Sequence, residues 1–358
     1  MRSSNLAPNT PNSVVVVIAS PLEAEHAARI TASFPQGVDL IYRPDLLPPI
    51  RYRGDHGGDP AWRRSSAGQA EWRTLLARAE VLWDLPVGEE GPTLALCPRL
   101  RWLQTTSAGV GPAVARRGLA ESDVLVTTAS GIHAGPLTEF VFAALLFHGK
   151  RLGHLQAEQR AHRWERFSGQ ELRGQTLAIV GPGRIGREIA RIARCFGMTV
   201  WAMARDNAPE RAAALGVDRL FARADLLEML AGANGLVLCA PQTAETVGMI
   251  GPAELAAVKP GAVLVNIARG AMVDEAALIS ALRSGQIGFA ALDVFHTEPL
   301  PTTSPLWDLP NVLVAPHSAS TVDGENAALT ERFIENLGHF LRGELDRMGP
   351  VLDKARLY

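Results

Sequence analysis

The sequence is poor in cysteine, and this scarcity excludes some kinds of protein. Its 358 residues include three cysteines, Cys97, Cys195 and Cys239. They are an odd number and lie far apart, which disfavours a disulfide framework and fits a reducing compartment. Cysteine and histidine nowhere cluster with the spacing of metal ligands. We therefore expect no metal site.

An excess of charge and long apolar runs are also missing. The formal net charge is −2, which provides no field to attract nucleic acid or an anionic membrane. The longest apolar runs, such as 14–19, are too short to cross a bilayer. Residues 1–13 are a polar tail without the apolar core of a signal peptide, and we expect this tail to be disordered. These features predict a cytoplasmic protein that binds neither nucleic acid nor membranes.

The sequence does contain two series of short apolar segments that alternate with helical ones. The strand candidates of the first series are 14–20, 38–42, 81–85, 100–106 and 123–128. Those of the second series are 177–180, 200–204, 236–240, 262–268, 289–295 and 312–316. Near-continuous apolar strands that alternate with helices indicate a parallel sheet covered on both faces. The predicted fold class is α/β, and the six strands of the second series are typical of a doubly wound nucleotide domain.

Three longer segments complete this organisation. Residues 136–152 predict a largely apolar helix suited to burial between domains or subunits. Residues 324–345 predict a helix that returns to the first series of strands. Residues 51–72 are rich in glycine, arginine and aspartate, and because the two signs of charge are mixed they predict a solvated loop.

A glycine-rich turn, GPGRIG at 181–186, directly follows the first strand of the second series. This pattern between a strand and a helix is typical of dinucleotide binding. Gly181 permits the tight turn, Gly183 lets backbone amides approach a pyrophosphate, and Gly186 allows the helix to pack closely on the sheet. The anion is expected at the positive end of the helix, and a purely structural glycine turn is the alternative. The residues expected to contact the cofactor here are Gly181, Gly183, Arg184, Ile185 and Gly186.

The end of the next strand is the place where an acidic residue binds the ribose hydroxyls of NAD. Ala204 stands there, and Arg205 follows it. A guanidinium forms a bidentate fork that matches a 2′-phosphate, so the sequence favours NADP(H). Two alternatives remain. If the strand runs further, Asp206 contacts the ribose and selects NAD(H); otherwise the Arg-Asp pair is only a surface turn.

Polar residues also follow the other strands of the second series. In an open parallel sheet, ligands bind outside the carboxyl ends of the strands. Because each of these residues comes just after an apolar strand, we expect them to rim one crevice. They are Gly181, Pro241, Arg269, Glu298 and His317.

Three of these residues have complementary chemistry. His317 is the one able to exchange a proton near neutrality. Glu298 is expected to accept the other imidazole N–H and so fix the tautomer. Arg269 offers a fork for an α-keto carboxylate or its carbonyl oxygen. The alternatives are a structural His–Glu pair and a surface arginine, and His296 is a weaker candidate than His317 because strand alternation does not place it.

Two acidic residues of the second series have other expected roles. Asp293 lies inside an apolar strand and therefore needs a hydrogen-bond donor, for which we expect the nicotinamide carboxamide. Asp274 is expected to cap the helix that follows it. Among the tryptophans, Trp83, Trp102 and Trp307 either wall a substrate pocket or belong to the core.

These motifs resemble those of the D-isomer-specific 2-hydroxyacid dehydrogenases. The matching segments occur in the family's order and spacing over residues 75–345. They are GPGRIG, VNIARGAMVDEAALISAL, ALDVFHTEPLP with SPLWDLPNV, and APHS. The resemblance implies the family's catalytic places for Arg269, Glu298 and His317. It also implies that the substrate carboxylate binds backbone amides of Ser107, Ala108, Gly109 and Val110.

The resemblance further implies two domains and a homodimer. A flavodoxin-like substrate domain is expected from residues 14–132 and 318–358. A Rossmann dinucleotide-binding domain is expected from 133–317, with a homodimer built around the interdomain helix. Residues 43–75 depart from the compact pattern of the family.

Within the family, Ala204 followed by Arg205 looks like the NADP-linked glyoxylate/hydroxypyruvate reductases. The sequence thus predicts an oxidoreductase that reduces a small 2-oxoacid to the D-2-hydroxyacid with NADPH, with NAD(H) as the alternative cofactor. Formate-oxidising relatives have glutamine at the place of Glu298, so formate is disfavoured. The rival interpretations are an NAD-dependent dehydrogenase of the phosphoglycerate or D-lactate type and a non-enzymatic, nicotinamide-sensing protein of the corepressor type.

Overall fold

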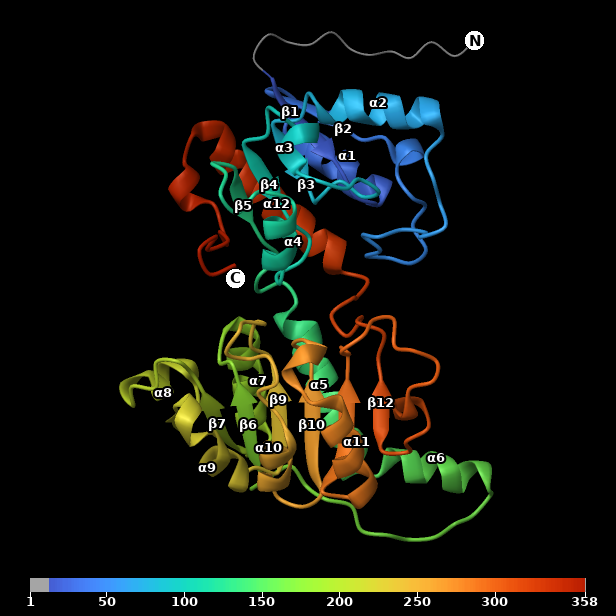
Figure 1. The fold of residues 1–358 in the computed structure, drawn as a ribbon, viewed down its shortest axis with the longest axis vertical. Coiled ribbons are helices and arrows are strands. Elements are labelled where there is room, and N and C mark those ends of the chain that lie inside the picture. The colour runs from blue at the N-terminus through green and yellow to red at the C-terminus, as the bar shows by residue number, and fades with distance from the viewer. Residues whose placement is uncertain (1–12, 358) are drawn as a thin grey trace. The chain divides into compact units, whose positions relative to one another are not determined.

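The computed structural model describes residues 13–357, which form two compact units. The first unit consists of the described residues up to Ile132 and from Val322 onward, and the second unit is His133–Thr321. Each unit is built on one parallel sheet (Figure 1). The predicted α/β fold with two doubly wound sheets is confirmed. The predicted disordered tail, 1–13, lies outside the described residues except for Ser13.

The sheet of the first unit has the strand order β2-β1-β3-β4-β5, which is the order of flavodoxin-like folds. Its strands are β1 (Val14–Ile18), β2 (Val38–Ile41), β3 (Val81–Trp83), β4 (Trp102–Gln104) and β5 (Leu125–Thr127). One face packs against α1 (Ala24–Ser33) and α12 (Glu325–Arg342). The other face packs against α2 (Ser66–Leu76), α3 (Thr93–Leu96) and α4 (Gly111–Arg116). Because both faces are covered, the strands are apolar in succession rather than in alternation.

The last long helix, α12, returns the chain to the first sheet, as its sequence predicted. Its buried Phe333 packs against Trp83 and Trp102 with ring centroids 5.3 Å and 5.0 Å apart. These two tryptophans are almost fully buried and therefore belong to the core rather than to the wall of a pocket. Trp307, in contrast, is 49% exposed.

The expectation of a solvated loop over 51–72 is wrong in part. Residues from Ser66 onward belong to α2, which buries Trp72 completely. The loop before it folds around Asp55, a buried carboxylate that accepts hydrogen bonds from the guanidinium of Arg51 and from backbone N–H groups of the loop. Burial alone would raise the pKa of Asp55, but these hydrogen bonds lower it to about 2. Part of the glycine, arginine and aspartate of this loop thus forms a local network around Asp55, while other residues of the loop, such as Arg53 and Arg63, are exposed.

The sheet of the second unit has the order β12-β11-β10-β9-β6-β7-β8. Its strands are β6 (Thr176–Val180), β7 (Thr199–Met203), β8 (Arg219–Phe221), β9 (Gly235–Leu238), β10 (Ala262–Asn266), β11 (Ile287–Leu292) and β12 (Val312–Val314). From β8 to β11 this is the strand order 3-2-1-4-5-6 of a Rossmann sheet, and β12 extends it. The sequence predicted six of these strands and missed β8, whose first residue, Arg219, is exposed, so that it is not a continuous apolar run.

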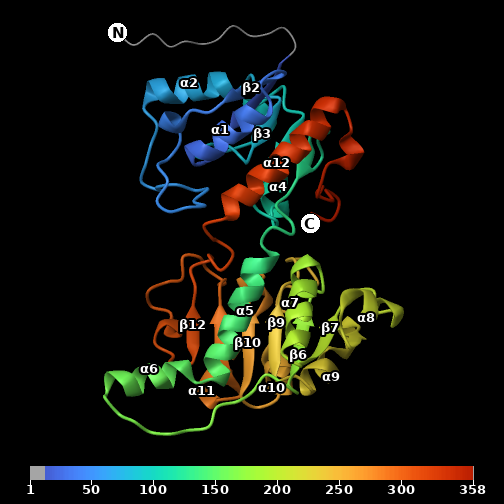
Figure 2. The same cartoon turned by 180° about the vertical axis from the view of Figure 1, so that it is seen from behind.

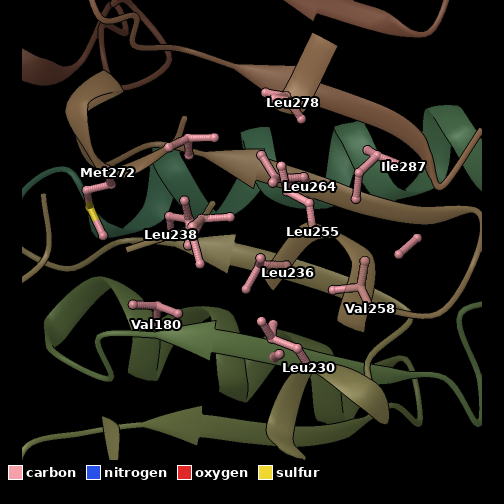
Figure 3. Close-up of a cluster of buried hydrophobic side chains, with 14 of the residues drawn as sticks. Val180, Leu230, Leu236, Leu238, Leu255, Val258, Leu264, Met272, Leu278 and Ile287 are labelled. Atoms are coloured by element: carbon pink, nitrogen blue, oxygen red, sulfur yellow. The ribbon is translucent and has the colours of Figure 1, made fainter. Parts of the chain in front are cut away.

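Helices cover both faces of the second sheet (Figure 2). On one face lie α5 (Ala134–Gly149) and α7 (Arg184–Cys195). On the other lie α9 (Leu226–Ala231), α10 (Pro252–Ala257) and α11 (Glu275–Ser284), whose leucines meet those of the strands in one apolar layer (Figure 3). α8 (Glu210–Leu215) packs Ala212 and Leu215 against the layer of α5 and α7, whereas α6 (Leu152–Arg160) buries no residue. The helix predicted over 136–152 ends at Gly149, and Arg151, in the left-handed region at φ 52°, separates it from α6.

None of the helices within residues 13–357 combines the length and the apolar composition needed to cross a membrane. The three cysteines are free thiols. Asp274 caps α11 as its position predicted, because its side chain accepts the backbone N–H of Ala277 at 3.0 Å.

Candidate active site

The carboxyl ends of the strands of the second sheet lie at one edge, because all neighbouring strands in this sheet are parallel. The segments that follow these ends carry most of the residues that the sequence singled out. They are the glycine turn at 181–186, Pro241, Arg269, Asp293, Glu298 and His317. The second unit therefore collects residues from five strand ends along one edge of its sheet, where ligands bind in open α/β folds.

His317, which follows β12, and Glu298, which follows β11, are joined by a hydrogen bond. Nδ1 of the imidazole lies 2.8 Å from Oε2 of the carboxylate. The other carboxylate oxygen, Oε1, accepts the backbone N–H of Phe295 at 2.9 Å, which fixes the orientation of the carboxylate. Because Nδ1 is held by Glu298, Nε2 is the ring nitrogen left to exchange a proton with a ligand. The side chain of His317 is 49% exposed.

The backbone around His317 is held in an uncommon conformation. His317 has φ 53°, in the left-handed region that non-glycine residues seldom adopt. Directly after it, the N–H groups of Ser318 and Ala319 both donate to Oδ1 of Asp293, at 2.8 Å and 2.9 Å. Burial raises the pKa of Asp293, and these two N–H groups oppose the shift. The donors that a buried acid requires thus come from the main chain beside His317, and a contact of Asp293 with nicotinamide stays a prediction.

Arg269 lies on the turn that leaves β10. Its Nη1 donates to the carbonyl of Ala268 at 2.6 Å, and the side chain is half-buried. The turn is held by Asn266, whose Oδ1 accepts the N–H of Ala268 and whose Nδ2 donates to the carbonyl of Arg269, both at 3.1 Å. Sequence analysis missed Asn266, although a polar amide at the end of the apolar run AVLVN is a usable signal for a buried hydrogen-bonding role.

The next residue, Gly270, packs this turn against the segment that carries Glu298. A Cβ atom at position 270 would overlap the backbone carbonyl of Phe295 and the nitrogen of His296. Phe295 is also the residue whose N–H binds Glu298. The Arg269 turn and the Glu298 segment are therefore in contact through a glycine that no larger residue can replace without movement.

The glycine turn after β6 has the geometry that a dinucleotide requires. Gly181 has φ 97°, and a Cβ there would lie 2.7 Å from Cα of Ala240. A Cβ at Gly186 would lie 2.5 Å from the carbonyl oxygen of Gly181, so the start of α7 packs closely on the strand. At Gly183 a Cβ would meet nothing within 4 Å, which leaves open space beside the first N–H groups of the helix, those of Arg184 and Ile185. These residues fit a pyrophosphate at the positive end of α7.

The end of β7 differs from that of an NAD-type site, as the sequence indicated. The strand ends at Met203, so Ala204 occupies the position after it and Arg205 is exposed. The alternative that the strand extends to Asp206 is wrong. The carboxylate of Asp206 instead accepts the N–H of Ala208 and pairs with Arg211 at 2.8 Å.

Pro241 begins the loop after β9, and this loop is held by a threonine that the sequence did not point to. The hydroxyl of Thr246 donates to the carbonyl of Pro241 at 2.9 Å and accepts the N–H of Thr243 at 2.8 Å. Thr246 is buried. The loop next to the glycine turn is therefore fixed by its own side chains.

In the first unit, Ser107, Ala108, Gly109 and Val110 form the loop between β4 and α4. The carbonyl of Ser107 accepts the N–H of Ala129 at 3.2 Å and the hydroxyl of Thr105 at 2.9 Å. Thr106 donates its hydroxyl to Asp84, which follows β3, at 2.7 Å. The loop that the sequence assigned to an anion is thus anchored on both neighbouring strands.

The sequence is similar to those of known proteins. The family model described as "D-isomer specific 2-hydroxyacid dehydrogenase, NAD binding domain" matches residues 142–319. A glyoxylate reductase of Thermococcus gammatolerans is 35% identical over 269 residues, which are 72% of this chain and 78% of the relative. A D-3-phosphoglycerate dehydrogenase of Mycobacterium leprae is 38% identical over 270 residues, 74% of this chain. The chain spans about half the length of that relative, 48%.

Two solved structures have similar folds. A D-isomer specific 2-hydroxyacid dehydrogenase family protein of Aeromonas salmonicida is 28% identical with a TM-score of 0.75, over 96% of this chain and 99% of the other. A D-isomer specific 2-hydroxyacid dehydrogenase of Xanthobacter autotrophicus, solved in complex with NADPH and MES, is 29% identical with a TM-score of 0.72, over 97% and 100%.

Proposed function

Since the chain belongs to the D-isomer-specific 2-hydroxyacid dehydrogenases, we propose that it reduces a small 2-oxoacid, of the glyoxylate or hydroxypyruvate kind, to the D-2-hydroxyacid with NADPH. The observation that carries this proposal is the hydrogen bond between His317 and Glu298 at the carboxyl edge of the second sheet. An imidazole whose Nδ1 is bound to a carboxylate presents Nε2 as a general acid and base.

In the proposed reaction, His317 protonates the substrate oxygen. NADPH held at the turn 181–186 would supply a hydride for C2 of the 2-oxoacid, which would leave negative charge on the former carbonyl oxygen. The proton on Nε2 of His317 moves to that oxygen, and the ring returns to its neutral form while Glu298 keeps hold of Nδ1. One hydride and one proton thus convert the C2 carbonyl to a hydroxyl, and His317 is reprotonated from solvent.

Two groups are assigned to the substrate carboxylate and carbonyl. The guanidinium of Arg269 offers planar, paired N–H donors to either group. In the first unit, the backbone amides of Ser107, Ala108, Gly109 and Val110 are assigned to the carboxylate. The tight anchoring of this loop on Thr105 and Ala129 supports a fixed anion site there.

Cofactor binding is assigned to the turn at 181–186, with Pro241 and Asp293 near the nicotinamide end. Support for NADPH over NADH comes from the end of β7, where Ala204 replaces the usual acid and Arg205 is exposed. The ion pair of Asp206 with Arg211 adds to this support. It occupies the carboxylate that would otherwise be the candidate to bind the ribose of NADH. NADH remains the alternative cofactor.

A specific observation also favours a second candidate, an NAD-dependent dehydrogenase of 3-phosphoglycerate, because relatives of that name are 38% identical. Its substrate carries a phosphate. We favour the smaller substrate with NADPH because Ala204 and Arg205 at the end of β7 support NADPH, whereas the second candidate uses NAD. D-lactate type activity and the corepressor-like role have no comparable observation in their favour.

We also propose a homodimer. The apolar helix α5 is followed by α6 and by a segment that exposes large apolar side chains. Leu152 and Leu155 are 39% and 44% exposed, and Trp164 is 97% exposed. Large apolar side chains that are exposed this close together in the sequence support a surface covered by another chain.

The test is a panel of glyoxylate, hydroxypyruvate, pyruvate and 3-phosphohydroxypyruvate, each with NADPH and with NADH, followed by the loss of reduced-nicotinamide absorbance. The proposal expects the highest kcat/KM for glyoxylate or hydroxypyruvate with NADPH. Higher values for the phosphorylated substrate with NADH would support the second candidate instead. No turnover with any substrate would refute both.

A further inference from the structure

Asn266 is a buried polar residue that the proposed reaction does not use. It is the last residue of β10 and only 1% exposed. Burying a polar amide is unfavourable unless its donors and acceptors are bound. Here Oδ1 accepts the N–H of Ala268 and Nδ2 donates to the carbonyl of Arg269. The side chain therefore binds the backbone on both sides of the Cα atom of Arg269: the N–H of Ala268 before it and the carbonyl of Arg269 after it.

The place of Asn266 in the sheet explains why an amide is needed. The N–H of Ile267 still bonds to the carbonyl of Leu238 in the neighbouring strand. One residue later the chain has left the sheet. The N–H of Ala268 therefore bonds to the side chain of Asn266 instead of to a carbonyl of a neighbouring strand. Aspartate offers an acceptor but no donor for the carbonyl of Arg269, and leucine offers neither.

The main chain of Asn266 also connects this turn to the neighbouring strand end. Its carbonyl accepts the N–H of Asp293 at 3.0 Å. The side chain of Asp293 in turn binds the N–H groups that follow His317. Arg269 and His317 are thus fixed through two adjacent buried residues, one at the end of β10 and one just after β11.

We propose that Asn266 is a positioning residue that holds the turn of Arg269, and with it the guanidinium, in the orientation that binds the substrate. This role rests on the proposed function, since it acts through the assigned contact of Arg269 with a 2-oxoacid. Asn266 itself touches neither substrate nor cofactor in this scheme. Its loss lowers kcat/KM for the 2-oxoacid and leaves the binding of NADPH unchanged.

The test is a double-mutant cycle of Asn266→Leu and Arg269→Ala in the full-length protein. Asn266→Leu is expected to lower kcat/KM for glyoxylate about 10- to 100-fold, because a turn misplaced by a fraction of an ångström loses paired contacts. In the Arg269→Ala background the same change is expected to cost less than about 3-fold, since residues that act through one another are not additive. Equal factors in both backgrounds would overturn the proposal. So would a loss confined to the Kd of NADPH, measured by the fluorescence of the bound cofactor.

Two further variants separate positioning from general stability. Asn266→Asp keeps the acceptor for the N–H of Ala268 and replaces Asn266→Leu in the cycle if the leucine variant fails to fold. Its effect on kcat/KM is likewise expected to be smaller in the Arg269→Ala background than in wild type. Asn234→Leu is the matched control. Asn234 lies just before β9, at the opposite edge of the sheet, and its Oδ1 accepts the N–H of Thr176 at 3.0 Å. It is expected to lower the melting temperature without changing kcat/KM, and a similar catalytic loss there would overturn the proposal.

A readout that needs no activity distinguishes failure of this inference from failure of the proposed function. The rate of phenylglyoxal modification of Arg269, followed by peptide mass spectrometry, reports how its guanidinium is held. We expect Asn266→Leu to change this rate several-fold and Asn234→Leu to leave it unchanged. If wild type reduces no 2-oxoacid, the proposed function is wrong, while an unchanged modification rate would reject the positioning role by itself.

Discussion

Nδ1 of His317 and Oε2 of Glu298 lie 2.8 Å apart, although the two residues follow different strands and are 19 positions apart in the sequence. The carboxylate is itself held by the N–H of Phe295, and the turn after His317 is held by Asp293. The pair is therefore fixed from both sides by the main chain of the second unit.

Glu298→Gln tests the charge of this pair while keeping its shape. Glutamine can bind either Phe295 or His317 through its single carbonyl oxygen, but it does not stabilise an imidazolium as a carboxylate does. We expect kcat with glyoxylate to fall about 10- to 100-fold, measured under saturating NADPH. An unchanged kcat would show that the pair is only structural.

Arg205→Ala tests the choice of cofactor. A charge-assisted contact with a 2′-phosphate contributes about 1.5–3 kcal/mol, so KM for NADPH should rise about 10- to 100-fold. KM for NADH should stay the same. Arg191→Ala is the control, since Arg191 lies on the exposed side of α7 and pairs with Glu188. Equal changes for both cofactors would argue against a phosphate contact.

Gly270→Ala tests the contact between the turn of Arg269 and the segment of Glu298. A methyl group at 270 overlaps the backbone of Phe295, and such overpacking typically costs about 1–3 kcal/mol or more. We expect a lower melting temperature together with a kcat/KM reduced at least about 10-fold. Gly135→Ala is the matched control, because a Cβ there meets nothing within 4 Å and alanine favours the helix.

Asp55→Asn tests the buried network in the first unit through pH. The folded pKa of Asp55 is about 2, below the ordinary value of about 3.9 for an unfolded chain. Its carboxylate therefore stabilises the fold above pH 4, by on the order of 2 kcal/mol, and this contribution is lost as the pH falls from about 4 to about 2. In urea unfolding followed by tryptophan fluorescence, wild type should exceed the variant in stability at pH 7, and the difference should shrink toward pH 2. A difference in stability that stays constant with pH would contradict this. Asp346→Asn, at an exposed aspartate, is the control and should not differ from wild type in stability at either pH.

The course of the chain could be predicted from the sequence because buried parallel strands are short and continuously apolar. The runs at 14–20, 177–180 and 262–268 each coincide with a strand of the structure to within a few residues. β8 escaped because it begins with the exposed Arg219 and is not continuously apolar. Helix α2 escaped because its polar start resembles the loop before it.

At the candidate site, side chains with evident chemistry were predictable and their supports were not. His317 and Glu298 pair as their order after two strands suggested. Asn266, Thr246 and the main-chain partners of Asp293 were not foreseen, because their partners are backbone groups whose positions only the folded chain determines. The sequence shows that a polar residue lies in an apolar segment. It does not show which group forms a hydrogen bond with that residue.

The most direct test of the account is the variant His317→Ala. The control is His296→Ala, which removes an exposed histidine from the same region of the second unit. The account predicts that kcat for glyoxylate reduction falls about 10²- to 10⁴-fold in the first variant, while the Kd of NADPH changes less than about 3-fold and the control keeps wild-type kcat. A His317→Ala protein that turns over glyoxylate at the wild-type rate would contradict it.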